Sequence, residues 1–143
     1  INAERADGKI LLLERAEGSA MAGFSFLPGV VLDEGEEPYA AARRELREES
    51  GLEVEGELTI LGTYPMFIYG RDFLQLTFHG LVGADVQLSH EHTGHQWVDP
   101  AEFSALFSGH NVRTLAAGND EVATLLANIG TDARRFIEYR SAR

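Results

Sequence analysis

The chain has 143 residues, and 44% of them are hydrophobic, which is enough for one substantial core. Its formal charge of −11 opposes binding to nucleic acid, whose phosphates need a basic surface. The absence of cysteine excludes disulfides, thiolate metal sites and a cysteine nucleophile. No apolar run approaches membrane-spanning length and no signal peptide is recognisable, so we expect a cytoplasmic protein without a membrane partner.

Strand and helix signals alternate along the chain, without internal repeats or low-complexity tracts. The predicted strands cover residues 9–14, 24–32, 53–64, 72–82 and 95–98, with a hairpin loop at 65–71. The predicted helices cover residues 38–50, a segment that begins at Pro100 with Asp99 as N-cap, and residues 112–128 and 132–140. This order predicts an α+β protein with a mixed β-sheet and helices on both sides.

The helix at 38–50 has clear start and stop signals. Pro38 suits the first helical position, where its missing N–H would have no partner in any case. Glu36 and Glu37 precede it at the positive end of the helix dipole. Gly51 suits the left-handed residue that closes a helix. We therefore expect this helix to end immediately before Gly51.

Three glutamates crowd onto one side of that helix. Glu45, Glu48 and Glu49 lie about one turn apart, and like charges at this spacing repel each other unless a cation lies among them. A solvated, salt-bridged surface is the alternative, because Arg44 and Glu48 are four residues apart and can pair. That alternative explains the arginines but leaves Glu45 facing Glu49. The pattern favours a divalent metal site and phosphate chemistry.

The stretch from residue 28 to 52, PGVVLDEGEEPYAAARRELREESGL, resembles the signature of Nudix hydrolases. That signature begins with a glycine, followed by five residues and a glutamate. Seven further residues precede the motif Arg-Glu-aliphatic-x-Glu-Glu-x-Gly-aliphatic. Glu36 matches the first glutamate, and Arg44 to Leu52 match every specified position. Val30 stands where the signature has its leading glycine, and Gly29 is intact beside it. A pattern of this length is far more specific than a lone glycine-rich loop.

The resemblance implies roles for several residues. It implies that Glu48 and Glu49 bind Mg²⁺ or Mn²⁺, that Glu45 is a ligand or a base, and that the Gly29 carbonyl joins the metal shell. It also implies that Glu36 and Arg44 hold the loop against the helix. Hard divalent ions prefer such oxygen ligands, and a metal-bound water is a usable nucleophile near neutral pH when a carboxylate takes its proton.

The resemblance also implies the fold of the whole chain. We expect one Nudix domain over residues 1–143, an α/β/α sandwich with a mixed sheet between helices. The first strand of that fold is expected to be truncated, because few residues precede position 9 and Ile1 stands in place of Met. The C-terminal helices, from about residue 111 to 143, have no assigned function.

A second candidate site is the segment Ser89 to Trp97, SHEHTGHQW. One interpretation is a transition-metal site formed by the three histidines His90, His92 and His95, with Glu91 as a further ligand. The other is the Nudix loop before the last strand of the sheet, which brings a further glutamate to the metal cluster. We favour Glu91 as an added ligand or base, and a polar surface loop as the explanation of the histidines.

Substrate residues are less well defined. Tyr69 and Phe67 lie where an aromatic side chain can stack on a base, although aromatic residues are more often core. Arg15 follows the first predicted strand and can meet a phosphate, with an ordinary surface charge as the alternative. We expect a small nucleoside diphosphate derivative as partner; the sequence leaves the oligomeric state open, a homodimer included.

Three functions fit the signature. The first is metal-dependent hydrolysis of a phosphoanhydride bond in a nucleoside diphosphate linked to another group, an activity on phosphorus-containing acid anhydrides. The second, a Nudix-fold isopentenyl diphosphate isomerase, uses a cysteine that this chain lacks. The third is a noncatalytic nucleotide-binding sensor domain, a class that usually loses signature glutamates. The complete set of glutamates favours the hydrolase.

Overall fold

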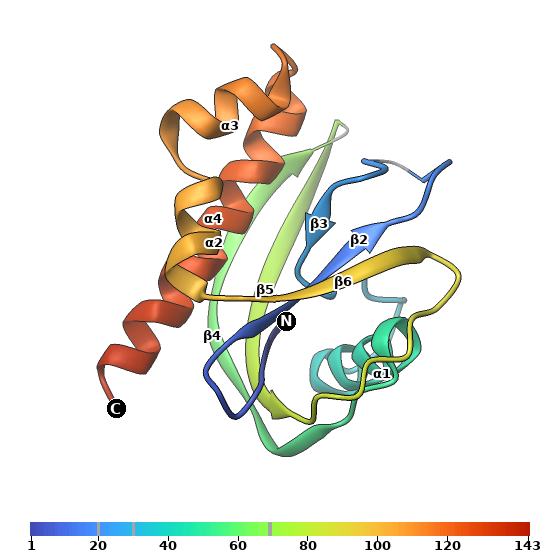
Figure 1. Ribbon diagram of the computed structural model, residues 1–143. Helices are drawn as coiled ribbons and strands as arrows, with labels where there is room; N and C mark the ends of the chain where they lie inside the picture. Colours follow the sequence, from blue (N-terminus) through green and yellow to red (C-terminus); the bar gives the residue numbers. More distant parts are fainter. Residues whose placement is uncertain (20, 30, 69) are drawn as a thin grey trace. The chain divides into compact units, whose positions relative to one another are not determined.

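The computed structural model describes residues 1–19, 21–29, 31–68 and 70–143 (Figure 1). These residues form two compact units. Unit 1 comprises Ile1–Thr59 and Phe78–Val98, and unit 2 comprises Ile60–Thr77 and Asp99–Arg143. In the described chain, no helix combines the length and the apolar character needed to cross a membrane.

The elements follow one another in the order expected of an α+β protein. The strands are β1 (Asn2–Glu4), β2 (Ile10–Arg15), β3 (Ser25–Phe26), β4 (Val54–Ile68), β5 (Arg71–Val82) and β6 (His92–Val98). The helices are α1 (Pro38–Ser50), α2 (Pro100–Leu106), α3 (Gly109–Ala116) and α4 (Asp120–Ser141). Strands β4 and β5 form a long hairpin, and residues of both strands occur in both units.

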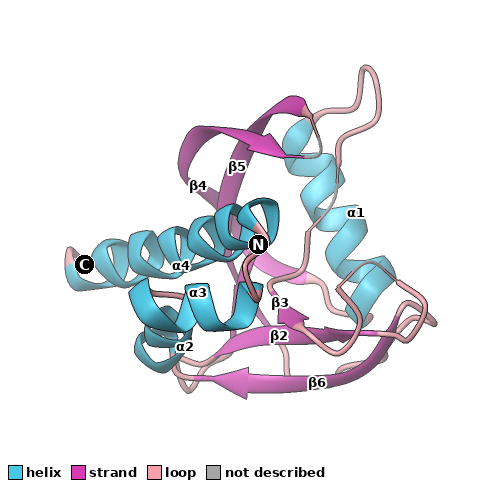
Figure 2. Cartoon of the chain, turned by 90° about the horizontal axis from the view of Figure 1, so that it is seen from above, coloured by secondary structure: helices cyan, strands magenta, loops and turns pink. Residues whose placement is uncertain are grey.

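Strand β2 is the centre of unit 1. Its residues Ile10 to Leu13 are all buried, as expected for a continuous aliphatic run in a strand that is covered on both faces. It pairs antiparallel with β1, β3 and β6, and β2 and β6 lie side by side over most of their length (Figure 2). Strand β1 pairs in parallel with β5. The sheet is therefore mixed, which confirms the predicted fold class.

Helix α1 has the predicted bounds because its termini are specified locally. The Glu37 carboxylate caps the first turn by accepting a hydrogen bond from Ala40 N at 2.9 Å. Gly51 adopts φ 70° at the other end, and its N–H donates to the Arg47 carbonyl at 2.8 Å. Ala41, Ala42 and Leu46 form the buried face of the helix. Of the three signature glutamates on the helix, Glu45 is partly buried, Glu48 is exposed and Glu49 is buried.

Three predictions for the sheet need correction. The strand expected at 24–32 is only Ser25–Phe26 long; Pro28 has no N–H for a sheet ladder, and Val31 is largely exposed. The hairpin loop expected at 65–71 is mostly strand, because β4 continues to Ile68. Pro65 is tolerated there since β4 is the last strand of the path β3-β2-β1-β5-β4 in the described sheet. The last strand, β6, also begins three residues earlier than predicted.

In unit 2, α2 and α3 pack along α4 (Figure 2). The Asp99 cap of α2 is confirmed, with its carboxylate accepting from Ala101 N at 2.8 Å. The predicted break near residues 129–131 is wrong: the chain turns at Ala117 and Gly118, and α4 continues through Gly130. A Cβ at Gly130 would collide with the Phe107 carbonyl oxygen, so this glycine permits close packing and does not end the helix.

Candidate metal and active site

The carboxylate site lies at the end of α1, where the loop before β6 is attached to the helix. Gln87 N donates to the Ser50 carbonyl at 2.8 Å, and Ser89 N donates to the Glu49 carbonyl at 3.1 Å. A Cβ at Gly51 would lie 2.9 Å from Gln87 Cβ, so the glycine also allows this loop to approach. These backbone contacts bring two distant segments of unit 1 to one place.

Glu49 is the buried carboxylate of the site. Its side chain is 12% exposed, and its Oε2 accepts a hydrogen bond from Gly29 N at 3.2 Å. Burial raises the pKa of Glu49 to about 7, the hydrogen bond from Gly29 opposes that rise, and the negative charges of Glu45 and Glu91 add to it. These charges act on Glu49 because the structure brings the three carboxylates near one another. The arrangement is electrostatically unfavourable when no cation is bound.

Arg44 balances part of this charge. Its Nε and Nη2 donate to the two carboxylate oxygens of Glu36 at 2.8 and 3.1 Å, and this guanidinium holds the pKa of Glu36 below its usual range. Its Nη1 also donates to Glu45 and, at 3.0 Å, to Glu48. The Arg44–Glu48 pair considered as the alternative for this helix is therefore present, and Arg44 also contacts the loop glutamate.

A bulge brings β2 and the start of β6 to the same site. The register between these strands shifts between Glu14 and Arg15, and Arg15 then pairs with His92. Ala16 N donates to the Glu91 carbonyl at 2.9 Å. Burial lowers the pKa of His92, and the positive charge of Arg15 lowers it further. The structure thus places Glu91 near Glu49, and Arg15 beside His92.

The donor chemistry of the site fits a hard divalent cation, because its side-chain donors are carboxylates. Among the described residues, no group of three or more His, Asp or Glu side chains is already arranged to hold a metal ion. Arg44 pairs with two of the glutamates of the cluster, Glu45 and Glu48.

Other predicted residues are placed differently. Phe67 is 62% exposed, which excludes a core role in the structure, and it belongs to unit 2. Tyr69 and Val30 lie outside the described residues. Of the histidines, His92 has a side chain only 5% exposed, whereas His90 and His95 are exposed. Sequence reasoning did not single out His92 as a neighbour of Glu49, because the contact depends on the register of β6 against β2.

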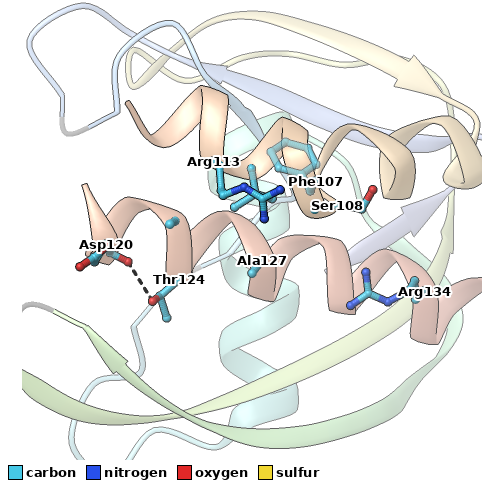
Figure 3. Close-up of a pocket in the computed structure, with 10 residues that line it drawn as sticks. Phe107, Ser108, Arg113, Asp120, Thr124, Ala127 and Arg134 are labelled. Atoms are coloured by element: carbon cyan, nitrogen blue, oxygen red, sulfur yellow. Dashed lines mark hydrogen bonds between the residues drawn. The ribbon is translucent and has the colours of Figure 1, made fainter. Parts of the chain in front are cut away.

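A cavity lies elsewhere, in unit 2. It has a volume of about 550 Å³ and lies between the segment from Phe107 to Arg113 and helix α4 (Figure 3). Arg113 and Arg134 reach it from opposite walls, and Ala127 lies between them. It contains none of the carboxylates described above.

The fold and the site define an α+β protein with a carboxylate cluster at the end of one helix. The chain belongs to the Nudix family: the model of the NUDIX domain matches residues 1–119. Among curated proteins, none matches this chain.

Solved structures agree with this family. A MutT protein from Methanosarcina mazei Go1 is 27% identical, with a TM-score of 0.73 over 96% of this chain and 89% of its own. The E. coli ORF135 protein is 26% identical, with a TM-score of 0.64 over 99% and 89%. A MutT NUDIX hydrolase from Burkholderia pseudomallei is 25% identical, with a TM-score of 0.60 over 69% and 79%.

Proposed function

We propose that this chain hydrolyses a phosphoanhydride bond in a nucleoside diphosphate linked to another group. The observation that carries the proposal is the surroundings of Glu49, a buried carboxylate that receives one backbone N–H and faces the charges of Glu45 and Glu91. Such a cluster is unfavourable by itself and favourable around a divalent cation. The membership of the Nudix family and the similarity to MutT hydrolases support the same reaction class.

In the proposed reaction, a water oxygen forms a bond to phosphorus while the bridging P–O bond breaks and the second phosphate leaves. Glu49, Glu45 or Glu91 takes the proton of the water. Glu45, Glu48, Glu49, Glu91 and the Gly29 carbonyl are the proposed ligands of Mg²⁺ or Mn²⁺. When bound, such an ion polarises the phosphoanhydride and makes the attacking water more acidic. Glu36 and Arg44 support the loop that carries Gly29.

Arg15 is the proposed contact for a substrate phosphate. Among the described residues, its Nε is buried and has no hydrogen-bond partner. Within the described residues, Arg15 has no ion pair at 4.0 Å or less. An anion that binds beside Glu91 would supply the missing acceptor. Phe67 and Tyr69 stay the proposed aromatic contacts of the base.

The test is a turnover panel. The protein is incubated with Mg²⁺ and ADP-ribose, NADH, dinucleoside polyphosphates or dNTPs, and released phosphate is measured after a phosphatase step. The proposal requires at least one substrate to be cleaved, with loss of turnover in Glu49→Gln. Binding of these nucleotides without cleavage of any would instead support the alternative, a noncatalytic nucleotide-binding sensor domain.

A further inference from the structure

His92 has a buried imidazole whose two ring nitrogens face different partners. Its Nδ1 lies 3.4 Å from Ser89 Oγ, and its Nε2 lies 3.7 Å from Glu49 Oε1. A buried polar group needs partners to offset the loss of water. In the described structure, these two residues provide the polar contacts of the ring.

The direction of the hydrogen bonds follows from the backbone. Glu91 N donates to Ser89 Oγ at 3.3 Å, so one lone pair of that oxygen is used and its proton is free to point at His92. His92 Nδ1 then accepts, and a neutral imidazole that accepts at Nδ1 carries its proton on Nε2. That proton points to Glu49 Oε1, which accepts it when the carboxylate is ionised. The chain of donors therefore runs from Glu91 N through Ser89 and His92 to Glu49.

The loop does not need the imidazole to hold its place. Backbone hydrogen bonds from Gln87, Ser89 and Ala16 already join it to α1 and β2. The side chain of His92 is therefore available to act on the Glu49 carboxylate. The separation of 3.7 Å is longer than a direct hydrogen bond, and contacts of this kind are often long before substrate binds and then shorten.

We infer that His92 is a positioning residue for Glu49, which acts through the orientation of one carboxylate oxygen. Gly29 N–H donates to Oε2, and His92 Nε2, aligned by Ser89, lies 3.7 Å from Oε1. The inference rests on the proposed function of Glu49 as a metal ligand or base. A carboxylate that is oriented at both oxygens presents its remaining lone pairs in one direction. Groups that orient a ligating or basic side chain typically change activity or metal affinity 10- to 100-fold when removed.

Two substitutions separate orientation from packing. His92→Gln places an amide N–H near the position of Nε2, whereas His92→Asn places one near Nδ1 and leaves Glu49 without its donor. We expect His92→Asn to lower kcat about 10- to 100-fold with KM changed less than about threefold. We expect His92→Gln to recover most of that loss. Equal losses in both variants would show a packing role and overturn the inference.

A second readout uses the protein without metal or substrate, so that it does not depend on turnover. The Gly29 amide donates to Glu49 Oε2, and its hydrogen exchange reports how firmly that carboxylate is held. We expect faster exchange at Gly29 in His92→Asn than in the wild type, weaker binding of Mn²⁺ by about tenfold, and values near the wild type in His92→Gln. Unchanged exchange and Mn²⁺ affinity in His92→Asn would refute the positioning role.

If His92→Asn does not fold, Ser89→Ala provides the same test, because it removes the hydroxyl that aligns the ring and keeps the imidazole. We expect the same direction of change at Gly29 and in Mn²⁺ affinity, and unchanged values would contradict the inference. If the wild type cleaves no nucleotide, the proposed function fails, and the exchange and Mn²⁺ measurements still decide the role of His92.

Discussion

Glu49 in unit 1 and Asp132 in unit 2 are both buried carboxylates, but their partners differ. Asp132 Oδ1 accepts hydrogen bonds from the hydroxyls of Tyr64, at 2.9 Å, and Thr77. Glu49 accepts one bond from a backbone amide and faces two further carboxylates. Burial raises the pKa of both groups, but neighbouring donors oppose the rise at Asp132, whereas neighbouring charges increase it at Glu49.

The two units also differ in net charge. Unit 1 contains 16 of the 23 acidic residues and 6 of the 12 basic residues, so most of the negative charge of the chain is in the unit that carries the site. Unit 2 is close to neutral. A carboxylate with satisfied hydrogen bonds, such as Asp132, stabilises a fold, whereas a crowded one stores unfavourable energy that a bound cation releases.

The largest expected effect is on turnover. Of the two carboxylate-to-amide substitutions Glu49→Gln and Asp132→Asn, only the first should reduce it. Glu49→Gln removes the charge that a base or metal ligand needs, and we expect a loss of about 10³-fold in kcat/KM. Asp132→Asn makes the same carboxylate-to-amide change at a buried position in unit 2 and should leave kcat/KM within about threefold. Kinetics on the best substrate of the panel measure both. A comparable loss in the two variants would remove the distinction between the carboxylates.

A pH dependence of stability follows from the pKa of Glu49 in the metal-free protein. The folded pKa of about 7 lies above the ordinary value of 4.5. The contribution of protonated Glu49 to the free energy of unfolding is therefore fully present below pH 4.5 and is lost as the pH rises through 7. The shift in pKa corresponds to a loss of about 3 kcal/mol in the free energy of unfolding. Urea unfolding in EDTA between pH 4 and 8 should show this loss in the wild type and a flatter profile in Glu49→Gln. Equal slopes would show that Glu49 ionises normally.

Asp132 should affect stability more than activity. Asp132→Ala leaves the Thr77 hydroxyl without its acceptor and leaves the Tyr64 hydroxyl only the Asn128 carbonyl. We expect a loss of about 2 kcal/mol in the free energy of unfolding. Asp132→Asn keeps an acceptor oxygen and should stay within about 1 kcal/mol of the wild type at neutral pH. Urea titrations of both variants give the comparison. A cost for alanine no larger than that for asparagine would exclude the hydroxyl pair as the stabilising feature.

How much of this could be predicted from the sequence depends on whether the signal was local. Helix α1 was predicted to the residue because Pro38 and Gly51 specify its ends, and its signature glutamates gave the family. Glu91 was placed beside them by analogy, and the structure brings it near Glu49. The metal ligand roles stay predictions.

Two of the errors came from contacts between distant residues. The helices predicted at 112–128 and 132–140 left a break between them, yet Gly130 in that gap packs against Phe107, and only the folded chain shows that contact. His92 looked like one of three similar histidines, and its burial follows from the bulge between Glu14 and Arg15 that sets the register of β6. Neither fact has a signature in the residues nearby. Long-range packing and register thus decided what periodicity could not.

The smallest expected effect concerns Arg44, the cation that pairs with Glu36, Glu45 and Glu48. Arg44→Lys keeps the charge but cannot make the two parallel bonds to Glu36, so the loop is held less firmly. We expect turnover to fall about tenfold. The free energy of unfolding should change by less than about 1 kcal/mol, because the pair is partly exposed.

Arg43→Lys is the matched control for that prediction. Arg43 lies beside Arg44 on α1 but donates to the carbonyls of Val54 and Gly56, and no described carboxylate of the site is its partner. Its replacement should leave turnover within about twofold while costing a similar small amount of stability. If both lysine variants lose turnover equally, the effect comes from a loosened helix. If only Arg44→Lys loses turnover, the loss is assigned to the pair between Arg44 and Glu36. That outcome shows that the pair supports the carboxylate site of unit 1 and not simply the stability of its fold.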